Sequence, residues 1–123
     1  GSGVEVIVGV QRDPRFGPVV MVGLGGVLTE VLADVAFALA PVSAATAREL
    51  LAGLRGAAIL DGVRGRAAVD LDALAEVVAA VSRAAVEHPE IAELAVNPVL
   101  AGAHGCVALD ARAVPVGDPS DQH

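Results

Sequence analysis

The sequence predicts an α+β fold in which an antiparallel sheet carries two helices on one face. Three observations predict it. Valines alternate with other residues between positions 4 and 10, two amphipathic helical segments occupy the middle of the chain, and two further strand-like segments follow them. Short glycine-containing turns join the neighbouring strands, and this favours antiparallel pairing over a parallel sheet with crossover helices.

The N-terminal third reads as strands and turns. Residues 4–10 have the period of a strand, residues 12–17 have the composition of a turn, and residues 18–24 form the returning strand of a hairpin. Residues 27–33 and 35–40 are rich in β-branched side chains, so we expect two more short strands there. The same stretch also fits a helix.

Two helices are expected next. Ser43 suits the N-cap of a helix over residues 44–55, and Gly56 suits its end. Residues 57–69 are expected to form a loop.

The second helix is expected over residues 71–87, with Asp70 as its cap and Pro89 enforcing its end. Its side chains at helical spacing predict which face is buried. That face consists of Leu71, Leu74, Val78, Val81 and Ala85.

The last two strands, expected near 91–100 and 106–113, meet at a glycine-containing turn. If this hairpin is centred between Ala103 and His104, Asn97 lies directly opposite Asp110. Strict alternation then places one set of residues against the helices, namely Leu94, Val96, Val107 and Leu109. It places a second set on the other face, namely Ala95, Asn97, Val99, Cys106, Ala108, Asp110 and Arg112.

An amide oxygen and a carboxylate that converge in this way suit Mg²⁺. This ion commonly takes one or two protein oxygens and completes its shell with waters and phosphates. The spacing alone leaves an alternative open, in which Asn97 begins a turn before Pro98 and Asp110 hydrogen-bonds to backbone at a strand end.

Composition excludes several classes of function. The net charge of −7 and the pI near 4.7 argue against nucleic-acid binding, and with no Trp or Tyr there is little to stack on bases. No apolar run is long enough to span a bilayer, so we expect a cytoplasmic protein without membrane contact. The single cysteine, Cys106, rules out an internal disulfide.

The chain reads as one domain within a longer protein. Gly1-Ser2-Gly3 is typical of a tag-cleavage scar, so we assign residues 1–3 to a scar and residues 4–113 to the domain. Residues 114–123 form a polar tail that we expect to be disordered.

Four ordered motifs resemble a known family. They read GVEVIVGVQRDPRFGPVVMVGLGGVLTEVLADVAFALAPV, LDGVRGR, ELAVNPV and ALDARA. In this order they are similar to the C-terminal lobe of the ATP-grasp domain of NDP-forming acyl-CoA synthetases. That family includes ADP-forming acetyl-CoA synthetases, is related to succinyl-CoA synthetase β chains, and has relatives fused to an acetyltransferase domain. The likeness covers roughly residues 3–113.

The resemblance implies a ligase reaction in which an acid, CoA and ATP give acyl-CoA, ADP and phosphate through a phosphohistidine. It implies ATP and Mg²⁺ as cofactors, with Asn97 and Asp110 as the metal ligands. It also implies that the N-terminal ATP-grasp lobe and the CoA-ligase portion that carries the phosphohistidine lie outside this segment. The segment alone, which contains no lysine, is therefore expected to be catalytically inactive.

One position departs from the family. Members usually carry an acidic residue two positions before the asparagine, where this chain has Ala95. In the expected register Arg112 lies opposite Ala95, so Arg112 is expected either to meet a phosphate or to turn toward Glu93. An alternative function follows, namely a degenerate nucleotide-sensing or scaffold module, as in an acetyltransferase fusion. A third possibility is an α+β interaction domain without a ligand.

Further candidates are less specific. Glu30 and Asp34 occupy acid positions of the family pattern and point either toward the active cleft or into solvent. Arg64 contacts an anion or fixes its own loop.

Arg12 and Asp13 are expected to stabilise their turn. None of the three histidines has an acidic partner placed by the sequence, so none is expected to accept a phosphoryl group.

Overall fold

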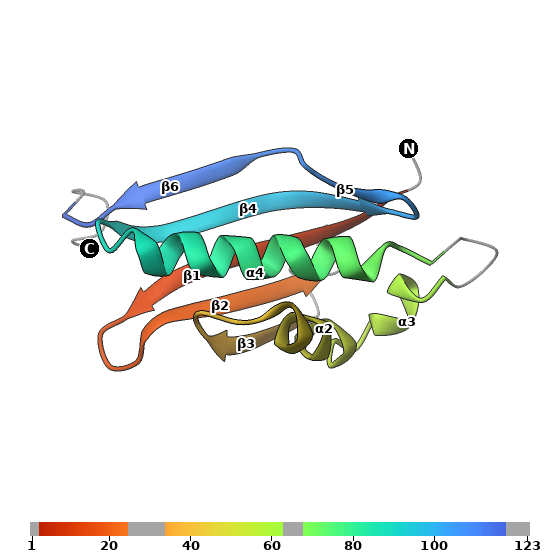
Figure 1. The fold of residues 1–123 in the computed structure, drawn as a ribbon, viewed down its shortest axis with the longest axis horizontal. Coiled ribbons are helices and arrows are strands. Elements are labelled where there is room, and N and C mark those ends of the chain that lie inside the picture. The colour runs from red at the N-terminus through yellow and green to blue at the C-terminus, as the bar shows by residue number, and fades with distance from the viewer. Residues whose placement is uncertain (1–2, 25–33, 63–67, 118–123) are drawn as a thin grey trace.

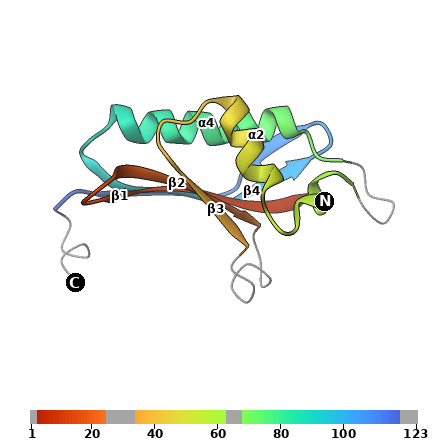
Figure 2. The same cartoon turned by 90° about the horizontal axis from the view of Figure 1, so that it is seen from below.

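The structure is a computed structural model that describes residues 3–24, 34–62 and 68–117. Its architecture is the expected one, a single antiparallel sheet with helices on one face (Figures 1 and 2). In the described residues the sheet order is β3-β2-β1-β4-β5, and β6 also pairs with β4. The strands are β1 (Val4–Asp13), β2 (Gly17–Leu24), β3 (Val35–Leu39), β4 (Ile91–Gly102), β5 (Gly105–Ala108) and β6 (Ala111–Pro115).

The strand predictions hold for the first hairpin and for residues 35–39, while the strand expected over 27–33 lies outside the described residues. The last expected strand is two strands, because the ladder is interrupted at Leu109 and Asp110. The strand β6 continues to Pro115, so the expected boundary between domain and tail at residue 113 falls inside a strand.

The first helix begins as predicted and ends early. In α2 (Ala44–Ala52) the Ser43 side chain accepts a hydrogen bond from the Thr46 N–H at 3.1 Å. The helix ends at Ala52 rather than residue 55, because Gly53 caps it. Residues 57–60, expected to be loop, form the short helix α3 (Ala57–Leu60).

The second helix is confirmed. In α4 (Leu71–Glu87) the Asp70 carboxylate accepts a hydrogen bond from the Ala73 N–H at 3.0 Å, as an N-cap should. The predicted inner face lies against the sheet, with Leu74 and Val78 fully buried. Within the described residues, no helix is both long and apolar enough to cross a bilayer.

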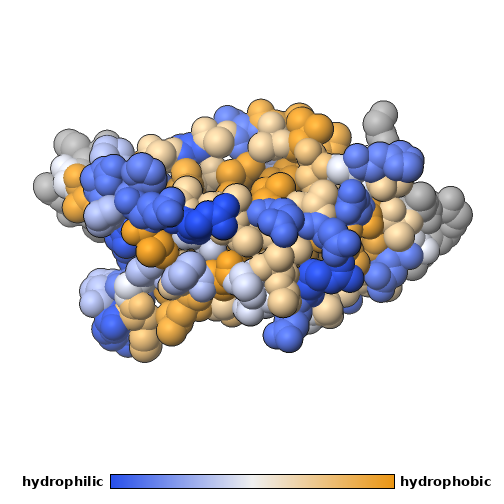
Figure 3. Space-filling model, viewed as in Figure 1, coloured by the Kyte–Doolittle hydropathy of each residue, from blue (hydrophilic) through white to orange (hydrophobic). Residues whose placement is uncertain are grey.

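The core lies between the sheet and the helices (Figure 2). Alternating valines of β1 and β2 supply its floor, and α2 and α4 supply its roof. Its fully buried members include Val6, Val8, Val20, Val22, Leu51, Leu74 and Val78. The outer side of the helix layer carries hydrophilic side chains interspersed with apolar ones, as expected of a surface in contact with water (Figure 3).

Two hydrogen-bonded contacts fix the helices in place. The fully buried Ser82 hydroxyl on α4 accepts from the Val42 N–H at 3.0 Å and donates to the Ala79 carbonyl at 2.9 Å. At the other end of α4, the Asp70 N–H donates to the Gly102 carbonyl at 2.7 Å and joins the helix to the β4–β5 hairpin. The half-buried Cys106 lies on this hairpin and contacts the core.

The thiol of Cys106 provides a test of this packing. Burial, together with the negative charge of Asp70, raises the pKa of Cys106 above its ordinary value. A raised pKa leaves less thiolate at a given pH, so the pH–rate profile for alkylation should have a higher midpoint in the folded protein than in the denatured chain.

Asp70→Asn keeps an N-capping side chain and removes the charge. It should move the midpoint back toward the denatured value. Coincident profiles for folded and denatured protein would contradict this packing.

Candidate functional site

The register of the last hairpin brings Asn97 and Asp110 together as the sequence predicts. On one side of the pair Val99 faces Ala108, and on the other side Val96 faces Ala111. Between them, the Asn97 N–H donates to the Asp110 carbonyl oxygen at 3.0 Å, and the Leu109 N–H donates to the Pro98 carbonyl at 3.0 Å. The two candidate metal ligands are therefore direct cross-strand neighbours.

The predicted assignment of side chains to the two faces of the sheet holds for the residues of β4 that precede Asn97, but not for those beyond it. Against β1, Val96 pairs with Val8 and Val99 pairs with Val6, so Asn97 and Pro98 together face the single residue Ile7. Such a β-bulge reverses the alternation of side chains along a strand.

The reversal corrects four face assignments. Val99 lies in the core and is fully buried, and Cys106 contacts the core, whereas Val107 and Leu109 are each 57% exposed. The assignments of Leu94 and Val96, which precede the bulge, are confirmed: Val96 is in the core and Leu94 packs against it.

Asn97 and Asp110 are both exposed to solvent. In the part of the chain that the structure describes, no group of three or more His, Cys, Asp or Glu side chains could hold a metal ion. A cage made only of protein ligands is thus absent from those residues. One amide oxygen and one carboxylate fit instead the partial ligand set that Mg²⁺ takes when waters and phosphates complete its octahedron.

Arg112 lies next to this pair. It faces Ala95 across the β4–β6 ladder, as the register predicts, and its side chain is exposed. Among the described residues its guanidinium forms no ion pair, and in particular none with Glu93. The expected turn toward Glu93 is therefore not observed, and the cation remains available beside the candidate metal ligands.

Most of the chain also matches a known family. Residues 1–114 match the model of the ATP-grasp domain. The chain belongs to this family. Its fold agrees with that of a solved structure, the dinucleotide-forming acetyl-coenzyme A synthetase 1 of Ca. Korarchaeum cryptofilum, with a TM-score of 0.89 and 42% identity over 94% of this chain. That protein is in complex with coenzyme A and Mg-AMPPCP, and its phosphohistidine segment points towards the nucleotide-binding site.

The curated relatives include several ADP-forming acetate–CoA ligases. This ATP-grasp chain is 45% identical over 112 residues to the β subunit of acetate–CoA ligase I from Pyrococcus furiosus, and it covers 48% of that subunit. It is 43% identical over 113 residues to acetate–CoA ligase I from Archaeoglobus fulgidus, and it covers 16% of that longer chain. The chain thus spans about half, or much less, of the relatives it matches.

The remaining candidates divide into those described and those outside the described residues. Glu30 and Arg64 fall outside. Asp34 is described, and it points neither into a cleft nor into solvent. It is buried, and its two carboxylate oxygens accept hydrogen bonds from the backbone N–H groups of Arg55 at 2.7 Å and Gly56 at 2.8 Å.

Asp34 therefore joins the start of β3 to the turn between α2 and α3. Gly56 leaves room for this contact, since a Cβ there would lie 3.1 Å from the Asp34 carboxylate and 2.4 Å from the Leu24 side chain. In the sequence, the signal for this role is the glycine that follows Arg55, although the helix pattern by itself explains that glycine as a stop.

Arg12 also has a role that the sequence did not show. Asp13 stabilises the turn as predicted, by accepting from the N–H groups of Arg15 at 2.7 Å and Phe16 at 3.1 Å. Arg12 instead reaches across to the end of α4. Its guanidinium donates to the carbonyls of Ala85, His88 and Ile91, and so caps the helix and holds the start of β4.

His88 has an acidic neighbour that the sequence pattern does not place. Nδ1 of His88 lies 3.2 Å from Glu90 Oε2 in an exposed pair. The pKa of Glu90 lies below its ordinary value, mainly because the backbone amide of Glu90 donates a hydrogen bond to the carboxylate. The His88 side chain lowers this pKa further through its hydrogen bond and its charge. The pair lies at the start of β4, which is several residues away from Asn97 along the strand.

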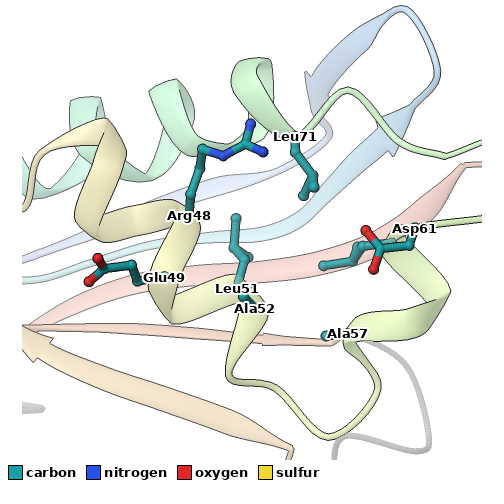
Figure 4. Close-up of a pocket in the computed structure, with 8 residues that line it drawn as sticks. Arg48, Glu49, Leu51, Ala52, Ala57, Asp61 and Leu71 are labelled. Atoms are coloured by element: carbon teal, nitrogen blue, oxygen red, sulfur yellow. The ribbon is translucent and has the colours of Figure 1, made fainter.

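A hollow of about 370 Å³ lies on the opposite side of the molecule from the open sheet face, between α2, α3 and α4 (Figure 4). Leu51 and Leu71 extend toward each other across it, and Arg48 and Asp61 lie at its margin. Neither Asn97, Asp110 nor Arg112 lines it, so it is not part of the candidate metal site.

The Asp34 contact gives a direct prediction on stability. Asp34→Asn keeps the shape of the side chain but replaces one acceptor oxygen with a donor group that faces a backbone N–H. We expect it to lower the free energy of unfolding by about 1–3 kcal/mol, measured by urea unfolding.

Asp72→Asn is the matched control, because Asp72 pairs with Arg48 on an exposed helix surface. It should cost no more than about 1 kcal/mol. Equal losses for the two variants would show that Asp34 does not anchor the α2–α3 turn.

Proposed function

We propose that this chain is the magnesium- and nucleotide-binding lobe of an ATP-grasp acyl-CoA ligase of the ADP-forming type. The observation that carries the proposal is the cross-strand pairing of Asn97 with Asp110, exposed on the sheet of a chain in this family. The complex of the Korarchaeum relative with Mg-AMPPCP supports it, since that compound is an analogue of Mg·ATP.

In this proposal each residue has a separate task. Asn97 supplies a neutral oxygen and Asp110 an anionic oxygen to Mg²⁺, which neutralises charge on the nucleotide phosphates when it is bound. Arg112, two cross-strand pairs along, supplies a planar cation suited to a phosphate oxygen pair. Asn97 lies on β4 and Arg112 on β6, and Asp110 lies between β5 and β6, where its carbonyl oxygen accepts from the Asn97 N–H. Backbone hydrogen bonds therefore fix all three positions.

The chemistry of the whole protein needs more than this lobe. Phosphoryl transfer depends on positioning and on charge from several sides of the phosphate. This chain has no lysine, and its candidate phosphate contacts are confined to one lobe. We therefore propose that the other ATP-grasp lobe and a CoA-ligase portion with its phosphohistidine complete the enzyme, and that this segment alone does not turn over.

A second candidate function follows from Ala95. Its methyl group faces Arg112. The family that the sequence resembles usually carries an acidic residue at this position. A site that binds Mg-nucleotide without passing on the phosphoryl group would act as a nucleotide sensor or scaffold. Turnover by the full-length protein separates the two functions: multiple turnovers of ATP with acid and CoA support the ligase, and tight binding without turnover supports the sensor.

The metal assignment is tested by removing both ligands. Asn97→Ala combined with Asp110→Ala in the full-length protein should weaken binding of Mg·ATP at least about tenfold, or 1.4 kcal/mol, by calorimetry. Binding of metal-free ATP should change much less, because the lost oxygens contact the ion. Asp72→Ala removes an equal charge from the helix side and should leave both affinities unchanged. If the double variant bound Mg·ATP like the parent, the assignment would be wrong.

Arg112 makes a separate prediction. Arg112→Ala should weaken Mg·ATP about five- to tenfold, as expected for the loss of one charge-assisted contact, without altering the magnesium concentration needed for half-maximal binding. Arg83→Ala, on the exposed side of α4, is the matched control for loss of a cation. An unchanged affinity in Arg112→Ala would remove this residue from the site.

A further inference from the structure

The sheet face opposite the helices is not uniform. At its β2–β3 end lies an apolar surface, the hairpin patch, which consists of Phe16, Val19, Met21, Phe37 and Leu39. Phe16 and Leu39 are each 60% exposed, and Phe37 is 62% exposed.

The patch is one surface because its members are cross-strand neighbours. Val19 pairs with Leu39, and Met21 pairs with Phe37. The residues that alternate with them on β2, Val20 and Val22, are fully buried beneath the helices. Alternation therefore turns Val19 and Met21 to the other face of the sheet.

The patch is hollowed. Phe16, Val19, Met21 and Phe37 line a hollow of about 480 Å³ beside the corner formed by residues 12–14. A second hollow of about 230 Å³ continues from Met21 and Phe37 across Gly9 of β1 to Ala95 of β4. Ala95 in turn faces Arg112, so this hollow ends beside the candidate magnesium site.

The chemistry of the patch is that of a protein interface. Large apolar side chains form its centre, and polar groups lie at one margin, where Arg15 lies 3.6 Å from Asp13 and 5.2 Å above the Phe16 ring. Interfaces commonly combine an apolar, aromatic centre with a polar margin. Contiguous exposed apolar surface of this kind on a folded domain marks a place where another surface docks.

The length of the relatives indicates what docks there. The chain covers 48% of the Pyrococcus β subunit and 54% of the Korarchaeum chain, so each relative carries a comparable length of polypeptide beyond the matched region. A sheet that has helices on one face and an apolar patch on the other requires a further layer to remove the patch from water. A second lobe within the same protein meets this need.

We propose that the hairpin patch is the docking surface for the second lobe of the full-length protein. The open face is thereby divided, with protein–protein contact over β2 and β3 and metal–phosphate chemistry over β4 and β6. This inference rests on the proposed function for the existence of the second lobe. It adds that the two lobes are in contact through the patch before any nucleotide binds.

Thiol labelling of the full-length protein tests the docking. In a background with Cys106→Ser and any other native cysteines replaced, Phe37→Cys and Leu39→Cys are each compared with Val86→Cys on α4. In this lobe Val86 is only 38% exposed, against 62% for Phe37. The lobe by itself thus predicts faster labelling at positions 37 and 39, whereas docking predicts the reverse order.

We expect the Phe37→Cys and Leu39→Cys thiols to react at least about tenfold more slowly than the Val86→Cys thiol, without nucleotide and at every protein concentration. Faster or equal labelling at both positions overturns the proposal. Protection that is lost on dilution assigns the patch to a second copy, and protection that needs Mg·ATP assigns it to nucleotide-driven closure; either result also overturns it.

The labelling result can be separated from misfolding of a variant and from failure of the proposed function. If Phe37→Cys does not fold, the labelling order at Leu39→Cys decides. Labelling in the absence of nucleotide does not depend on Asn97 or Asp110. If the patch is protected but the protein does not bind Mg·ATP, the docking surface stands and the proposed function fails. If the patch is not protected but the protein binds Mg·ATP, the proposed function stands and the docking surface fails.

Discussion

The pairing of β4 on both of its edges is the constraint on which the rest of the structure depends. This strand joins β1 on one side, and β5 and β6 on the other. The guanidinium of Arg12, which projects from β1, holds its start through Ile91, and the Asp70 amide holds its end through Gly102. Because both ends of α4 are fixed by the same contacts, the helix layer and the candidate site share one frame.

The bulge at Asn97 and Pro98 gives this strand two functions at once. It reverses the side-chain alternation, so that Val96 and Val99 both enter the core although they are three residues apart. A regular strand would have turned one of them to water. Asn97 at the reversal and Asp110 opposite it are exposed, and there two polar side chains cost little in desolvation. A bulge beside a functional site is a common device for directing side chains.

The two faces of the sheet serve different purposes. The helix-covered face is filled by valines and leucines and supplies the stability of the fold. The other face keeps large apolar side chains exposed over β2 and β3 and polar ones near β4 and β6. A lobe organised in this way is suited to work against another surface with a ligand held at one end. The Asp34 contact, which fixes the start of β3, is part of the same arrangement, because it holds the strand that carries Phe37.

The sequence by itself determined the features that depend on neighbouring residues. Ser43 and Asp70 begin their helices, and the Gly102–Gly105 turn sets a hairpin register that places Asn97 opposite Asp110, because caps and tight turns are local interactions. Only the tertiary structure decided the rest. The faces of Val99, Val107 and Leu109 depend on how β4 meets β1, some ninety residues earlier in the chain. The partners of Asp34 and Arg12 are backbone groups 21 or more residues away. A backbone carbonyl or amide has no residue identity, so no sequence pattern could have revealed those contacts.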